Sequence, residues 1–193
     1  MNDKNFHIML VDTPWAGPIA KVISGPDIMV DDGVFIDNVK NNYEILLSVD
    51  EQADNPEEFQ PCDIHGSTRN LMFSSRLIDI LNKQGVDNIQ YFNANTIYEP
   101  TGEQYNYKVA NVLGIISGLD MDKSDVILSR KGNVLEIEKM VLVEEKMQGH
   151  NVFRLQESIM HIIVHKSIKE AIEAAGLTGF MFLSDDEYEP GML

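Results

Sequence analysis

The clearest structural signal in this chain is the stretch Leu71-Met-Phe-Ser-Ser-Arg-Leu-Ile-Asp-Ile-Leu-Asn-Lys-Gln-Gly-Val-Asp-Asn-Ile-Gln-Tyr-Phe92. The same pattern returns without a gap 91 residues later, as Ile162-Ile-Val-His-Lys-Ser-Ile-Lys-Glu-Ala-Ile-Glu-Ala-Ala-Gly-Leu-Thr-Gly-Phe-Met-Phe-Leu183. Each copy begins with an apolar run, continues with an amphipathic segment that a glycine ends, and closes with a second apolar run. We therefore predict two strand-helix-strand units offset by 91 residues.

The helix of each unit is predicted from an apolar stripe at helical spacing. The stripes are Leu77, Ile80 and Leu81 in the first unit and Ile168, Ala171, Ile172 and Ala175 in the second. Ser167 and Glu170 have the spacing of a capping box, in which each side chain bonds a free backbone N–H at the start of a helix. Gly85 and Gly176 stand where a left-handed residue commonly ends a helix.

The remainder of the chain reads mainly as strands and turns. Strands are predicted at residues 6–11, 34–36, 43–49 and 134–143, and the apolar run 109–119 fits either a strand or a short helix. Because the helices lie between strands, the fold class that we predict is α+β, a mostly antiparallel sheet with a few packed helices. A chain of 193 residues is long enough to bury a substantial core, and we expect residues 1–193 to form a single domain.

The acidic composition bears on the kind of partner. Asp and Glu number 31 against 15 Lys and Arg, a net charge of −16. So negative a field disfavours nucleic acid and anionic membranes as partners and favours cationic proteins. The alternative interpretation is an acidic surface that only keeps the protein soluble.

The expected location follows from what the sequence lacks. The first residues show no secretory signal, and no apolar run approaches the roughly 18–20 residues that cross a bilayer. A lone cysteine, Cys62, fits a reducing compartment, and we expect a cytoplasmic protein.

Three patterns superficially resemble metal sites. His161 and His165 are four residues apart in a strand-like context, where their side chains would stand about 13 Å apart. Cys62 and His65 have no second pair of matching spacing, although a structural zinc usually takes four ligands. The acidic turn at residues 120–125 lacks the glycine and the final glutamate of a calcium-binding loop. We therefore expect no metal and no cofactor.

The sequence also lacks a nucleophile elbow, a phosphate-binding loop, a zinc-protease motif and a dinucleotide fingerprint. These absences favour a binding protein over an enzyme. Two alternatives stay open: a metal-dependent hydrolase using Asp, Glu and His side chains, and an acidic regulatory module that binds a basic endogenous protein.

Acidic clusters in expected loops are the candidate partner-binding residues, because binding residues concentrate in loops. The set is Asp31, Asp32, Asp54, Glu57, Glu58, Asp185, Asp186, Glu187 and Tyr188. Aromatic side chains are the candidate anchors of an interface. These are Trp15, Tyr43, Phe59, Tyr98 and Tyr188.

From Cys62 onward the chain resembles a known family. The matching segments are Asp63-Ile64, Phe73-Ser-Ser-Arg-Leu77, Ile89-Gln-Tyr-Phe92, residues 109–113 and 119–124, Val152-Phe-Arg-Leu155, Ile163-Val164 and residues 177–182. In this order and spacing they resemble the immunity proteins of bacterial polymorphic toxin systems, in particular a widespread group once described only as a domain of unknown function. The resemblance divides the chain into a variable N-terminal part, residues 1–61, and a family-like region, residues 62–193.

The resemblance implies a non-catalytic cytoplasmic protein that binds and neutralises a cognate toxin domain. The acidic charge suits a cationic toxin such as a nuclease, whose basic surface binds phosphates. Residues 1–61 are expected to influence which toxin is bound.

Overall fold

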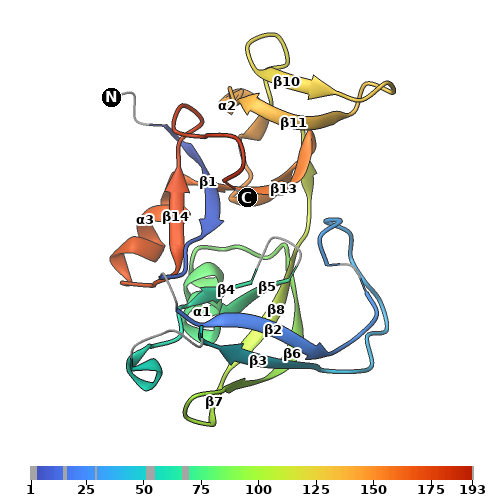
Figure 1. Cartoon of the computed structure of the whole chain (residues 1–193). Coiled ribbons are helices and arrows are strands. Elements are labelled where there is room, and N and C mark those ends of the chain that lie inside the picture. Colours follow the sequence, from blue (N-terminus) through green and yellow to red (C-terminus); the bar gives the residue numbers. More distant parts are fainter. Residues whose placement is uncertain (1–3, 15–16, 29, 51–54, 67–69, 193) are drawn as a thin grey trace.

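The computed structural model describes residues 4–14, 17–28, 30–50, 55–66 and 70–192, and it shows two larger sheets and a separate hairpin (Figure 1). The first sheet has seven strands: β2 (Ile19–Ser24), β3 (Tyr43–Ser48), β6 (Ile89–Tyr98), β8 (Tyr107–Val112), β5 (Leu71–Ser74) and β4 (Ile64–His65) in spatial order, with β7 (Glu103–Tyr105) on β6. The second has five: β14 (Phe180–Leu183), β1 (Phe6–Val11), β13 (Ser158–His165), β12 (Val152–Leu155) and β9 (Ile115–Ile116). The hairpin pairs β10 (Asp125–Leu128) with β11 (Val134–Lys139).

The helical elements are few and short. They are α1 (Ser75–Lys83), α2 (Glu144–Met147), α3 (Lys166–Ala174) and a 3₁₀ turn, η1 (Pro56–Glu58). Most strand pairs are antiparallel, with the parallel pairs β3–β6 and β9–β12 as exceptions. The predicted α+β fold is confirmed.

The two repeated units are present, and each encloses one further strand. The units are β5-α1-β6 and β13-α3-β14. In the first, β8 lies between the two strands, antiparallel to both; in the second, β1 takes that place. The registers agree, because Phe92 faces Val109 as Leu183 faces Ile8. The inserted strand therefore follows its unit in one case and comes from the N-terminus in the other.

The two helices begin at equivalent positions of the repeat, but side chains of different types cap them. The Ser74 hydroxyl accepts a hydrogen bond from the Leu77 N–H at 3.2 Å, and His165, 91 residues later, accepts through Nδ1 from the Ser167 N–H at 3.2 Å. The predicted capping box is therefore wrong, because α3 begins at Lys166 and Ser167 already lies inside its first turn. The predicted helix ends are confirmed, since Gly85 and Gly176 have φ of 73° and 61°.

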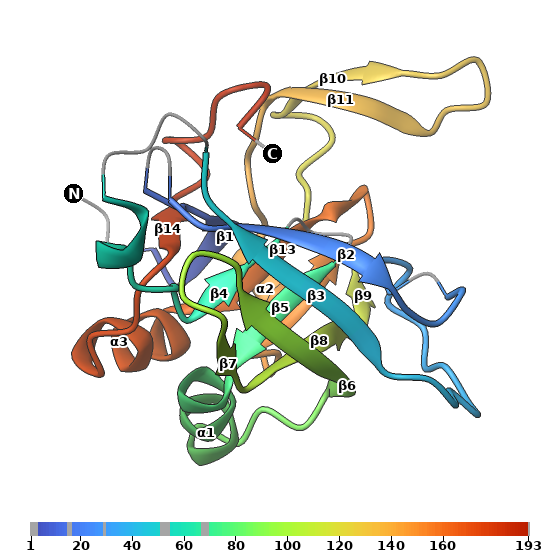
Figure 2. The ribbon, with the colours of Figure 1, turned by 60° about the horizontal axis from the view of Figure 1, so that its bottom comes forward.

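One core lies between the two units, and α1 and α3 contact each other at its edge (Figure 2). Both units contribute apolar side chains at equivalent positions. These are Leu71, Leu77 and Leu81 from the first unit and Ile162, Ile168 and Ile172 from the second. Burying a side chain of this size stabilises the fold by about 1.5–3 kcal/mol, so the shared core links the stability of the units.

A buried carboxylate adds a polar link between the units. Asp63 accepts hydrogen bonds from the Ser74 hydroxyl at 2.7 Å and from the Thr178 N–H at 3.1 Å. Arg76 lies 3.3 Å from the same carboxylate and also donates to the carbonyl of Ala175, where α3 ends. The start of the first helix is thereby fixed to the end of the second.

The individual strand predictions have mixed outcomes. The strands at 6–11 and 43–49 are confirmed, and 134–143 contains β11. The run 109–119 forms strands rather than a helix. Residues 34–36 are not a strand. Their backbone forms hydrogen bonds with side chains, as described below, and not with a neighbouring strand.

Candidate partner-binding surface

The predicted partner-binding residues fall into three segments. Asp54, the side chain of Glu57 and the anchor candidate Trp15 lie outside the described residues. Glu58, at the end of η1, is exposed. The other predicted residues belong to the connection between β2 and β3 and to the tail that follows β14.

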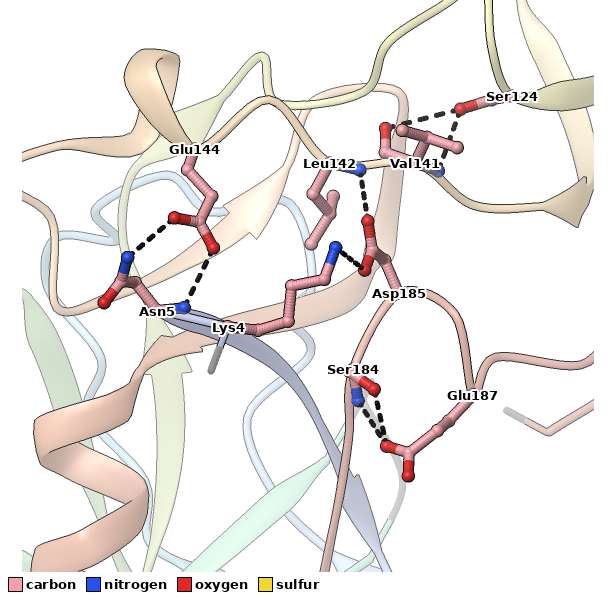
Figure 3. A network of polar contacts seen from close by, with 9 residues as sticks. All are labelled: Lys4, Asn5, Ser124, Val141, Leu142, Glu144, Ser184, Asp185 and Glu187. Atoms are coloured by element: carbon pink, nitrogen blue, oxygen red, sulfur yellow. Dashed lines mark hydrogen bonds and ion pairs between the residues drawn. The ribbon is translucent and has the colours of Figure 1, made fainter. Parts of the chain in front are cut away.

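In the C-terminal tail, Asp185 serves the fold (Figure 3). Its side chain is buried, with Oδ1 2.8 Å from Lys4 Nζ, and Oδ2 accepts the Leu142 N–H at 2.9 Å. The hydrogen bond to Asp185 raises the pKa of Lys4. Beside it, the Glu144 carboxylate accepts both the backbone N–H and the side-chain amide of Asn5, at 2.8 and 2.7 Å. The start of β1 is thus held by carboxylates on two sides.

The next tail residues are more accessible. Glu187 is exposed, but its carboxylate accepts the hydroxyl and the N–H of Ser184 at 2.7 and 2.9 Å, which lowers its pKa. Tyr188 is half-buried, with its ring 5.2 Å from the ring of His161. Asp186 is exposed. Of this cluster, Asp186 and Glu187 present carboxylates to solvent.

The connection between β2 and β3 contains Asp31 and Asp32 and projects beyond the sheet (Figure 2). Asp31 is buried and Asp32 is exposed. The same connection contacts Arg154, which is fully buried on β12. Burial lowers the pKa of Arg154, and both carboxylates oppose that shift. Asp31 and Asp32 therefore help to stabilise a buried cation of the scaffold.

We call residues 30–36 the anchored loop, because the scaffold bonds its backbone at several points. Arg154 donates to the carbonyl of Val30 at 3.1 Å, and Asn111 donates to the carbonyl of Val34 at 2.8 Å. The amide of Gln90 accepts the Ile36 N–H at 3.0 Å and donates to the Ile36 carbonyl at 2.6 Å, as a neighbouring strand would.

Between these bonds the loop exposes two apolar side chains. Val34 is 62% exposed and Phe35 is 61% exposed. Their neighbour Gly33 has φ of +66°, and a Cβ there would lie 2.9 Å from Ile115, itself partly exposed on β9. The anchored loop therefore places an aromatic side chain at the surface on a backbone that scaffold side chains hold.

The aromatic residues expected as anchors are placed differently. Tyr43 and Tyr98 are 3% and 1% exposed, so they are wrong as anchors: both pack in the core under the seven-stranded sheet. Phe59 is half-buried beside that core. Phe35 was missed because its apolar neighbours read as a strand. The available signal was the Asp31-Asp32-Gly33 turn directly before it.

The residues considered as metal ligands are mostly buried. In the described part of the chain, no three His, Cys, Asp or Glu side chains come together in a way that could hold a metal ion. Burial raises the pKa of the Cys62 thiol and lowers the pKa of His65 and His161 to about 4. No described helix has the length and apolar character needed to span a membrane.

Comparisons with known proteins identify a family. Residues 42–185 match the family model described as Immunity protein family (Imm11). The match includes both repeated units and leaves β1 and the anchored loop outside. A search of curated proteins returns no match.

Proposed function

The chain belongs to the Imm11 immunity protein family, and we propose that it is a non-catalytic protein that binds a cognate bacterial toxin domain and neutralises it in the cytoplasm. The observation that carries this proposal is the family match, which spans residues 42–185 and both units of the fold. The structure suits such a role, because a core shared between two units gives a stable scaffold for a binding surface.

We extend the proposal to the chemistry of the toxin. A protein with a net charge of −16 attracts a cationic partner, and a nuclease-type toxin is cationic where it binds phosphates. Exposed carboxylates at the rim of an interface chiefly accelerate association. Among the predicted residues, Asp32, Glu58, Asp186 and Glu187 are exposed, whereas Asp31 and Asp185 are buried. We assign steering to the exposed set, in which Asp32 also helps to stabilise Arg154, and scaffold roles alone to the buried pair.

Co-expression tests the proposal directly. The toxin domain encoded beside the gene of this chain is induced in a bacterial host, alone and together with the full chain. We expect growth arrest with the toxin alone, rescue with the chain, and a one-to-one complex when both are purified. Growth arrest that persists although the chain is soluble would refute the proposed function.

Salt dependence tests the proposed charge of the toxin. Replacing Asp32, Glu58 and Asp186 by their amides should slow association at low salt and have a smaller effect at high salt, because salt screens exposed charges. Asp79→Asn on exposed α1 is the matched control for the loss of a single surface charge. An association rate that does not depend on salt would contradict a cationic toxin while leaving neutralisation intact.

A further inference from the structure

We infer that the anchored loop is the main contact of this chain with its toxin, with Phe35 and Val34 entering an apolar pocket of a cationic protein domain. This inference rests on the proposed function and names the surface that carries it. The side chains that dominate protein interfaces are commonly aromatic, and they lie in pockets within a rim of weaker contacts.

The loop is held in place before binding. The carbonyls of Val30, Val34 and Ile36 all accept hydrogen bonds from scaffold side chains, at 3.1, 2.8 and 2.6 Å. Two of the donors, Asn111 and Arg154, are fully buried. Binding through a loop that is already ordered loses little conformational entropy, which favours affinity. Exposed apolar side chains on such a loop are suited to recognition.

The charge of the segment that contains the loop complements a cationic partner. In the sequence that contains the loop, residues 27–44 carry four exposed carboxylates and one exposed basic side chain. These are Asp27, Asp32, Asp37 and Glu44 against Lys40. The excess of carboxylates in this segment attracts a cationic surface to the part of the molecule where Phe35 is exposed. Exposed apolar side chains in a mainly acidic segment therefore suggest both the anchor and the charge of its partner.

The hairpin β10–β11 is the strongest competing surface. It exposes Ile127, Leu128 and Leu135, the last to 67%. Its charges balance, because three acidic residues within 125–139 face three basic ones. The hairpin therefore offers apolar contact without the charge that a cationic toxin would select. It also lies within the residues that match the family model, whereas the anchored loop lies outside them.

The edge strand β2 is a second competing surface. Ile19, Val22 and Ile23 are exposed along it. However, its pairing with β3 is irregular between Val22 and Ser24. Bulges of this kind commonly protect an edge from pairing with another chain. We therefore place the anchor on the loop.

The test measures binding of the full chain to the neighbouring toxin domain, purified as a catalytically inactive variant. Phe35→Ala should weaken binding by about 30-fold or more, while Phe35→Leu should retain binding within several-fold. Leu135→Ala on the hairpin is the matched control, because its side chain is exposed to a similar extent, 67% against 61% for Phe35. Melting temperatures of all variants should equal that of the wild type, since neither side chain is in the core.

The outcomes separate the two proposals. A wild-type chain that fails to bind the toxin refutes the proposed function itself. Wild-type binding that is unchanged by Phe35→Ala, or lowered equally by Leu135→Ala, overturns the anchored loop as the main contact and leaves neutralisation standing. A loss that is specific to Phe35→Ala, with binding retained in Phe35→Leu, supports the inference.

Discussion

Acidification should destabilise this protein through two buried histidines. His65 and His161 have pKa values of about 4 in the folded chain because burial disfavours the imidazolium, whereas the usual value is 6.5. Between these values the unfolded chain binds more protons than the folded one, so stability falls as pH decreases from 6.5 toward 4. At pH 5.0 each ring costs about 2 kcal/mol, and the two together about 4 kcal/mol. That is a large share of the 5–15 kcal/mol typical of a folded domain.

Urea unfolding at pH 7.5 and 5.0 measures this loss. The acidic groups whose pKa is lowered, Asp120, Asp186 and Glu187, stay ionised at both values and do not mask the effect. His65→Leu removes one titrating ring and should reduce the pH-dependent loss by about half. Equal free energies of unfolding at the two pH values would refute the reasoning, because they would show that the folded chain accommodates both imidazolium ions.

Three substitutions test the packing and the buried polar contacts by urea denaturation, and two of them are paired with a control variant. Asp185→Ala should lower the free energy of unfolding by about 1–3 kcal/mol, because a buried ion pair and a hydrogen bond from the Leu142 N–H are lost. Exposed Asp186→Ala should have a smaller effect. Equal effects of the two would contradict the scaffold role. Gly179→Ala would place Cβ 2.7 Å from Cys62 at φ +92° and should cost about 2–4 kcal/mol. Gly132→Ala, which meets open space at φ +83°, should cost about 1–2 kcal/mol. Arg154→Met leaves three carbonyls without their donor and should cost about 3–5 kcal/mol; a wild-type midpoint would show that other groups replace it.

The parts of the fold that could be predicted are those that neighbouring residues determine. The stripe spacing of Leu77 and Leu81, repeated at Ile168 and Ile172, depends on local helix geometry and placed both helices correctly. The same holds for the glycines that end them. The cap of α3 could not be predicted in this way, because a histidine in the position of Ser74 carries no common capping signal, while Ser167 and Glu170 have the usual spacing.

The contacts that could not be predicted join residues far apart in the sequence. Val34 and Phe35 have the composition of a strand, and side chains 54 and 77 residues away hold the segment as a loop instead. Asp185 and Asp186 are adjacent and chemically identical, yet one pairs with Lys4 in the interior and the other is exposed. Sequence reasoning therefore identified acidic clusters but could not separate their structural members from their accessible ones.

The position of β1 sets the order of events during synthesis. Phe6–Val11 is synthesised well before both of its neighbours in the sheet, Ser158–His165 and Phe180–Leu183. At about 5–20 residues per second, β1 waits on the order of ten seconds or more for β14. The second sheet therefore closes only after β14 has been synthesised, and a chain that ends before Phe180 cannot assemble it. Only a chain that extends through Phe180–Leu183 carries both neighbours of β1.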